Sequence, residues 1–326
     1  MNALPATLLT PRVLFPFLFV TLIWGSTWIV ITGQLGVVPP SWSVAYRFLV
    51  GAAAMFAYAL WRGERLMLSG PAWGFAALLG AAQFAINFNF VYRAEQHITS
   101  GLVAVLFALL IVPNTLLGRF FLKTKVAPRF LLGGTIAILG VGLMIVQEYR
   151  AAALDADAVL IGTALTLSGV LCASAANVMQ GTGLARAQPM VVMIAWAMLF
   201  GALSDAVFAW VTTGPPTIEP TVPYLGGVLY LGVIASAVTF PLYFNIIREV
   251  GPGQAAWSSV LIPIIAMALS TLFEGYRWAP LSIAGALVAL AGLVIAVAKR
   301  PDKPSVSGNM VSVPVEDGDA GTVSPR

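Results

Sequence analysis

Leu110-Ile111-Val112-Pro113 recurs further along the chain as Val260-Leu261-Ile262-Pro263. Downstream of each proline lies a stripe of small residues with the same spacing. The two stripes are Gly133, Ala137 and Gly140 in the first half, and Gly285, Ala289 and Gly292 in the second. Because the same proline motif and small-residue spacing occur in both halves, the first half of the chain is interpreted as a distant copy of the second.

The composition places the chain in a membrane. Of its 326 residues, 59% are hydrophobic and only 9% are charged, against roughly 25% charged residues in a soluble domain. A bilayer core about 30 Å thick requires roughly 20 apolar residues for each helical crossing. The apolar blocks predict ten spans, near residues 13–32, 42–61, 72–92, 99–121, 130–147, 158–180, 190–211, 223–247, 254–273 and 279–298.

The fold follows from the number of spans in each copy. Five is odd, so the second copy must start on the opposite side of the membrane from the first. We therefore expect an all-α integral membrane protein with ten transmembrane helices in two inverted five-helix repeats, an architecture found in secondary transporters. The expected divisions are an N-terminal segment 1–12, a first repeat 13–147, a second repeat 158–298 and a disordered tail 299–326.

The distribution of basic residues predicts the orientation. If the N-terminus is cytoplasmic, the opposite side holds only Arg93, Arg150 and Arg277, while most other Lys and Arg residues fall on the cytoplasmic side. This asymmetry predicts a multi-pass protein of the inner or plasma membrane with both termini in the cytoplasm. The net charge of +4 then reflects topology, and no nucleic-acid partner is expected, because no aromatic and basic platform is present.

Polar residues inside the spans are the best guide to a site, because lipid offers them no hydrogen bonds. Serine and threonine often bond to their own helix, and a tryptophan near a span end is often an interfacial anchor. An amide such as that of Asn87 or Asn177 instead requires a polar cavity or a polar helix junction. The predicted substrate-binding residues are Trp24, Trp28, Gln83, Asn87, Tyr92, Asn177, Thr239, Tyr243, Trp257 and Ser258.

The paired prolines and glycine stripes suggest mechanical roles. Pro113 and Pro263 cannot donate a backbone hydrogen bond, and each frees a carbonyl one turn earlier. We interpret them as a hinge or gate at matching points of the two halves, with a static kink as the alternative. The glycine stripes permit close helix contact, either between the halves or between subunits.

Ionisable residues within the spans are few. Arg47 lies about two turns from the predicted outer end of its span, so we expect a structural role in which it snorkels or binds backbone carbonyls. Asp205 lies towards the end of span seven, where we expect it to be solvated.

Other function classes fit poorly. An intramembrane enzyme needs a nucleophile with a positioned base, or a metal with its ligands. The chain has one histidine and one cysteine, Cys172, and no paired carboxylates within its spans. We expect no catalytic residues, no metal and no cofactor, and a receptor would not need two equivalent halves. An intramembrane enzyme or a receptor remains a distant alternative.

Several motifs together resemble the EamA repeat of the drug/metabolite transporter superfamily. They are Trp24-Gly25-Ser26-Thr27-Trp28, Pro39 and Pro40 with Arg47-Phe48, the two span prolines, and Phe273-Glu274-Gly275 before the second glycine stripe. The resemblance covers roughly residues 14–147 and 158–298. The first copy departs from it by placing Lys123-Thr124-Lys125 where an acid matching Glu274 is expected.

This resemblance implies a ten-helix bundle around a central cavity, with spans five and ten at its edge. It also implies a metabolite exporter, as in the YddG-like amino-acid exporters of the superfamily. Sugar-phosphate and nucleotide-sugar exchangers and multidrug exporters also belong to the superfamily, so the residues must decide among substrates.

The scarcity of charge in the spans narrows the substrate. Phosphates would require cavity Lys or Arg, and lipophilic cations would require a buried carboxylate. A neutral or zwitterionic metabolite remains, with aromatic and other hydrophobic amino acids fitting best. We expect facilitated export, with a proton-coupled exporter of other metabolites or drugs as the alternative. The expected partners are a small amino-acid-like substrate and the lipid bilayer, and the protein is expected to be a monomer or a weak dimer.

Overall fold

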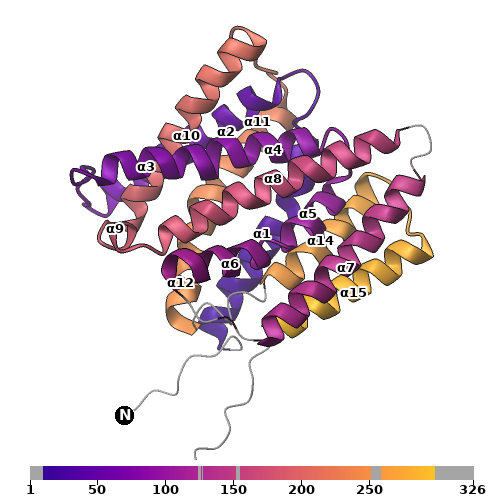
Figure 1. The fold of residues 1–326 in the computed structure, drawn as a ribbon. Helices are drawn as coiled ribbons and strands as arrows, with labels where there is room; N and C mark the ends of the chain where they lie inside the picture. The colour runs from indigo at the N-terminus through magenta and orange to yellow at the C-terminus, as the bar shows by residue number, and fades with distance from the viewer. Residues whose placement is uncertain (1–9, 124–125, 127, 152–154, 251–257, 298–326) are drawn as a thin grey trace, which may run out of the picture.

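The computed structural model describes residues 10–123, 126, 128–151, 155–250 and 258–297, and within them every regular element is a helix (Figure 1). Two helices continue without a break into π-helical segments, labelled η1 and η2. The elements are α1 (Pro11–Thr32), α2 (Pro40–Trp61), α3 (Ala72–Gly80), η1 (Ala81–Ile86), α4 (Asn87–Ala94), α5 (Ser100–Ala108), α6 (Ile111–Leu122), α7 (Pro128–Ala151), α8 (Ala156–Gln180), α9 (Gly183–Arg186), α10 (Met190–Thr213), α11 (Val222–Leu229), η2 (Tyr230–Val238), α12 (Thr239–Val250), α14 (Ser258–Phe273) and α15 (Pro280–Val297).

Eight of the helical segments in the described residues are long and apolar enough to cross a membrane. They fall on the first eight predicted spans. The ninth and tenth contain the shorter apolar helices α14 and α15. At 1.5 Å per residue, the 16 residues of α14 extend about 24 Å, less than the roughly 30 Å of a bilayer core. A total of ten crossings therefore stays a prediction.

Helix ends follow local backbone chemistry. Helices α1 and α2 start with prolines at the first turn, where the missing N–H has no intrahelical partner to lose. Helix α10 ends at Gly214, whose φ of 87° favours glycine. We call the end of the bundle where α1 starts the Pro11 end, and the end where α1 finishes the Thr32 end.

The two glycine stripes pack against each other. Helices α7 and α15 lie side by side at one edge of the molecule (Figure 1). A Cβ atom added to Gly140 would collide with the backbone nitrogen of Ala289 and lie 2.6 Å from the carbonyl oxygen of Gly285. The backbones are therefore in direct contact, and the stripes join the two halves of the chain, one of the two uses expected from the sequence.

The two π-helical segments occupy the third and the eighth spans, which are the same span of each half. Both lie at close backbone contacts. An added Cβ on Gly80, just before η1, would overlap the Ala197 carbonyl of α10, and one on Gly232 of η2 would lie 2.7 Å from the Arg47 carbonyl of α2. π-segments are frequent at functional sites, because they interrupt the regular backbone hydrogen bonding.

Helix pairing repeats between the halves. Helix α1 packs on α14, and correspondingly α8 packs on α5 and α6. Helix α4 packs on α8, and correspondingly α12 and η2 pack on α1. Helix α10 packs on α3 and η1, and correspondingly α2 packs on η2. Exchanging each helix for its counterpart in the other half therefore leaves the list of neighbours nearly unchanged.

The paired prolines differ in their local structure. The fourth span is broken at Leu109 and Leu110, between α5 and α6, and Pro113 lies in the first turn of α6. Pro263 lies within α14, which continues through it. The same proline motif therefore lies just after a helix break in the first half and within a continuous helix in the second.

Candidate functional site

A cavity of about 430 Å³ lies between the two halves. Its walls come from α1, α2, η1, α4, α5, α6, α8, η2, α12 and α14. Eight residues predicted from the sequence as binding or hinge residues line it: Trp24, Trp28, Gln83, Asn87, Asn177, Tyr243, Ser258 and Pro263.

Aromatic side chains form one wall of the cavity, and their neighbours hold them in place. The indole Nε1 of Trp24 donates a hydrogen bond of 3.2 Å to the carbonyl of Ala235, within η2. The Trp24 ring lies 4.9 Å from the ring of Tyr243, and Trp28 lies 5.3 Å from Phe107. Tyr243 also hydrogen-bonds Ser258. Fixed aromatic faces of this kind suit an apolar or aromatic group of a ligand.

Amide oxygens provide the polar part of the wall. The Asn87 side chain donates from Nδ2 to the carbonyl oxygen of Gln83 at 3.2 Å, which fixes the orientation of its amide. Within the described part of the chain, Asn87 Oδ1 and Gln83 Oε1 are buried and accept no hydrogen bond. Because a buried unpaired acceptor is costly, these two oxygens are suited to a ligand's donor groups.

Four other predicted residues are placed differently. Tyr92 is fully buried and its hydroxyl donates to Gln34 Oε1 at 2.8 Å. The Thr239 hydroxyl donates to the Ile234 carbonyl of its own helix at 2.6 Å. Neither they nor Pro113 are among the residues of the cavity wall. Trp257 lies outside the described residues.

Arg47 does line the cavity, although the sequence suggested only a structural role for it. Its side chain is 3% exposed, and its guanidinium lies 4.3 Å from the centre of the Phe88 ring. The backbone-carbonyl contacts expected for it are not formed by Nε or Nη1, which have no hydrogen-bond partner among the described residues. Its place two turns inside a span, away from both span ends, was the signal that could have marked it as a site residue.

At the Thr32 end of the bundle, a group of polar side chains connects neighbouring helices. We call this group the Thr32-end cluster; it consists of Thr32, Glu95, Ser100 and Glu274. The Thr32 hydroxyl donates to Glu95 Oε2 at 2.8 Å. Burial raises the pKa of Glu95, and nearby Glu274 raises it further, whereas the Thr32 hydrogen bond and the Arg47 charge lower it. The cluster connects α1, α5 and the ends of α4 and α14.

Asp205 is not solvated, contrary to expectation. It is fully buried on α10, and Asn89 donates a hydrogen bond to its Oδ1. Asn89 Oδ1 in turn accepts hydrogen bonds from Arg93 and from Ser41, each at 2.6 Å. The expectation was wrong because α2 and α4 cover this face of α10, which the sequence of α10 alone does not reveal. Asp205 does not belong to the cavity wall.

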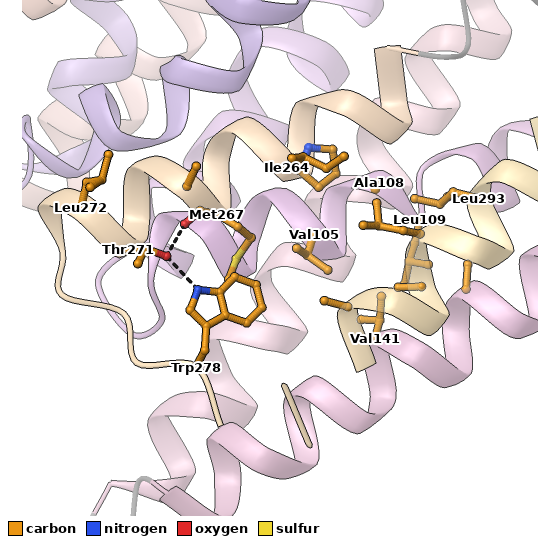
Figure 2. Close-up of a pocket in the computed structure, with 16 residues that line it drawn as sticks. Val105, Ala108, Leu109, Val141, Ile264, Met267, Thr271, Leu272, Trp278 and Leu293 are labelled. Atoms are coloured by element: carbon orange, nitrogen blue, oxygen red, sulfur yellow. Dashed lines mark hydrogen bonds between the residues drawn. The ribbon is translucent and has the colours of Figure 1, made fainter. Parts of the chain in front are cut away.

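A second cavity, of about 520 Å³, lies between α5, α14 and the pair α7 and α15 (Figure 2). Its wall is almost entirely aliphatic. Its polar groups are paired, since Trp278 Nε1 donates to Thr271 Oγ1 at 3.0 Å and the Thr271 hydroxyl donates to the Met267 carbonyl at 2.7 Å. This cavity offers no unpaired polar group to orient a ligand, so the first cavity is the better candidate site.

Comparison with known proteins agrees with this architecture. The chain is similar to the "Probable amino-acid metabolite efflux pump" of Escherichia coli strain K12, at 23% identity over 86% of this chain and 93% of that protein. It is similar to the "Uncharacterized inner membrane transporter YedA" of the same strain, at 27% identity over 88% and 92%. It is also similar to "Protein PagO" of Salmonella typhimurium, at 24% identity over 80% and 84%.

A crystal structure of another protein has the same fold. It aligns with a TM-score of 0.62 at 21% sequence identity, over 87% of this chain and 96% of that chain. The model of the EamA-like transporter family matches residues 12–146 and again residues 160–298. These two matches cover most of the chain, which therefore belongs to the EamA-like transporter family.

Proposed function

We propose that this membrane transporter exports small neutral or zwitterionic metabolites, amino acids with aromatic or hydrophobic side chains first among them. The observation that carries the proposal is the cavity of about 430 Å³ between the halves. Its volume lies in the range typical of small-molecule sites. Its wall combines the aromatic faces of Trp24 and Trp28 with the amides of Gln83 and Asn87.

Transport would proceed by alternating access between two inverted five-helix repeats. The support is the exchange of helix neighbours between the halves, the π-segments in matching spans and the α7 and α15 contact. In this mechanism the halves rock about the cavity. The break at Leu109 and Leu110 before Pro113, and Pro263 in the cavity wall, would be the gating points.

The substrate class follows from the charges around the cavity. The described wall contains no Asp, Glu or Lys, so it offers nothing to neutralise a lipophilic cation. A single arginine is a weak site for a diphosphate, which ordinarily requires several donors. A relative named as an amino-acid metabolite efflux pump supports the same class.

Export would be facilitative and directed out of the cytoplasm. The buried carboxylate of Asp205 lies outside the cavity wall, where a substrate could not exchange with its proton. The bias of Lys and Arg residues supports cytoplasmic termini, and with them a cytoplasmic Pro11 end. The cavity reaches Asn177 and Gln180 near the last turn of α8, towards that end.

The test is substrate counterflow in proteoliposomes containing the purified protein. The panel comprises phenylalanine, leucine, glutamate, a nucleotide sugar and a lipophilic cation. We expect saturable flux of phenylalanine and leucine, reduced at least tenfold by Asn87→Leu but not by the exposed control Arg62→Gln. Flux of only the nucleotide sugar or the cation would overturn the proposal.

A further inference from the structure

Arg47 presents a positive charge beside the cavity, and the carboxyl group of Glu95 interacts with this charge without forming an ion pair. It lies seven positions after Pro40, the start of α2, which places it about 10 Å along the helix from that end. Among the described residues of the cavity wall, it carries the single formal charge. No carboxylate lies within 4.0 Å of it in the described part of the chain.

The donors of Arg47 are poorly satisfied. Nε carries one N–H and Nη1 carries two, so three of the five N–H groups of the guanidinium have no partner among the described residues. Its charge also interacts with the Tyr92 and Tyr230 hydroxyls and with the carboxyl group of Glu95. Packing against Phe88 and Phe48 compensates part of the charge, at 4.3 and 5.0 Å from the two ring centres. An arginine stays charged in a protein, so an anionic partner would stabilise this arrangement.

The wall of the same cavity also contains two unpaired acceptors. Asn87 precedes Phe88, the residue against which Arg47 packs, and its Oδ1 is buried without a partner in the described structure. Gln83 lies one turn earlier, and its Oε1 is also buried and accepts no hydrogen bond within the described structure. The wall thus holds a cationic donor on α2 and two neutral acceptors on η1 and α4.

We propose that Arg47 binds the carboxylate of the substrate, while Asn87 and Gln83 accept hydrogen bonds from its ammonium group. The ligand class is a free α-amino acid, whose side chain would lie against Trp24, Trp28 and Phe107. This inference rests on the proposed function and makes it more specific, because it requires a free carboxylate. Arg47 is then a specificity-determining residue of the cavity.

The inference is tested by ligand binding to the purified full-length protein in detergent, measured as thermal stabilisation over a titration. The probes are L-phenylalanine, L-phenylalaninamide, which lacks the carboxylate, and 3-phenylpropionate, which lacks the ammonium group. Losing a hydrogen-bonded charge should weaken binding by roughly tenfold to a hundredfold. We expect phenylalaninamide to bind the wild-type protein more weakly than phenylalanine by this factor, and 3-phenylpropionate also to bind more weakly.

Substitutions of Arg47 test whether this residue causes the preference for a ligand with a free carboxylate. In Arg47→Gln, phenylalanine should bind as weakly as phenylalaninamide, whose own affinity should change less than threefold. Arg47→Lys should recover part of the discrimination, because it keeps the charge without the planar fork. The control is Arg62→Gln, which removes an exposed arginine at the Pro11 end of the same helix.

The outcomes separate the two proposals. Equal binding of phenylalanine and its amide to the wild-type protein would overturn the role of Arg47 and leave amino-acid export standing. Wild-type protein that neither binds nor transports phenylalanine, leucine or glutamate would overturn the proposed function, and this inference with it. The comparison of ligands on the wild-type protein decides the point even if Arg47→Gln fails to fold.

Discussion

Glu274 accepts two hydrogen bonds from Ser100, one from its backbone N–H at 3.1 Å and one from its hydroxyl at 2.6 Å. Ser100 starts α5 in the first half, and Glu274 follows α14 in the second. A carboxylate at the N-terminus of a helix also interacts favourably with the helix dipole. This contact therefore joins the two halves at the Thr32 end of the cavity.

Removing Glu274 should loosen the Thr32 end. Hydrogen bonds to a charged group contribute about 1.5–3 kcal/mol each, so Glu274→Ala should raise the population of molecules open at this end by roughly tenfold or more. The measurement is the rate at which a membrane-impermeant maleimide, added on the Thr32 side, labels Ile31→Cys in a Cys172→Ser background. Ile31 lines the cavity and is 1% exposed.

The matched control for this experiment is Glu219→Ala. Glu219 lies in the loop between α10 and α11 at the same end and hydrogen-bonds only a close neighbour, Thr221, among the contacts of the described chain. Its removal should leave the labelling rate unchanged. Equal labelling in Glu274→Ala and wild type would show that the Ser100 contact does not close this end.

The Thr32-end cluster should respond to pH through Glu95. Burial and the proximity of Glu274 raise the pKa of Glu95 in this arrangement, so its neutral form is favoured here. The state in which the Thr32-end cluster is assembled, here called the closed arrangement, is therefore most stable at a pH below the ordinary pKa range of a carboxyl group. It loses stability as the pH rises towards the raised pKa of Glu95. Labelling of Ile31→Cys from the Thr32 side should accelerate over that interval, after correction for the pH dependence of the maleimide reaction itself.

Glu95→Gln tests this interpretation. The amide stays neutral and can still accept the hydrogen bond from Thr32, so the closed arrangement should persist at every pH. Corrected labelling should then be slow and independent of pH, provided that Glu274 stays paired with Ser100. An undiminished pH dependence in this variant would assign the response to another group.

The sequence predicted those features that depend on local chemistry. Prolines and glycines placed most helix ends within a few residues, and the glycine stripes anticipated the contact between α7 and α15. The amide of Asn87 is buried and lines a cavity, as expected because a buried amide needs polar surroundings, whereas Asn177 lines the same cavity but is exposed.

Features that depend on tertiary contact were not predictable in this way. Whether Arg47 reaches the surface or a cavity depends on the position of Phe88, on another helix. Asp205 is buried because α2 and α4 cover it, and the i−5 hydrogen bond of Thr239 depends on the π-segment η2. None of these neighbours is close in sequence, so hydropathy and spacing could not reveal them.

Two neighbouring glycines of α7 offer a test of the contact between the halves. At Gly140 a Cβ atom would overlap the α15 backbone, whereas at Gly142 it would meet nothing within 4 Å. Gly140→Ala should destabilise the protein by about 1–3 kcal/mol, as overpacking does. Gly142→Ala should be neutral or slightly stabilising, because alanine favours helix. Thermal unfolding midpoints in the same detergent check this pair, and equal midpoints would contradict the close packing.

Asp205→Asn should leave transport largely intact. The substituted side chain is nearly the same size and keeps an oxygen that can accept the hydrogen bond from Asn89, so the contact with α4 is preserved. Because Asp205 lies outside the cavity wall, facilitated flux does not require its proton. We expect counterflow of phenylalanine within roughly threefold of wild type, the usual scale of a small perturbation remote from the site. Loss of flux in a variant with a normal thermal midpoint would instead identify Asp205 as a proton carrier and replace facilitated export with proton-coupled export.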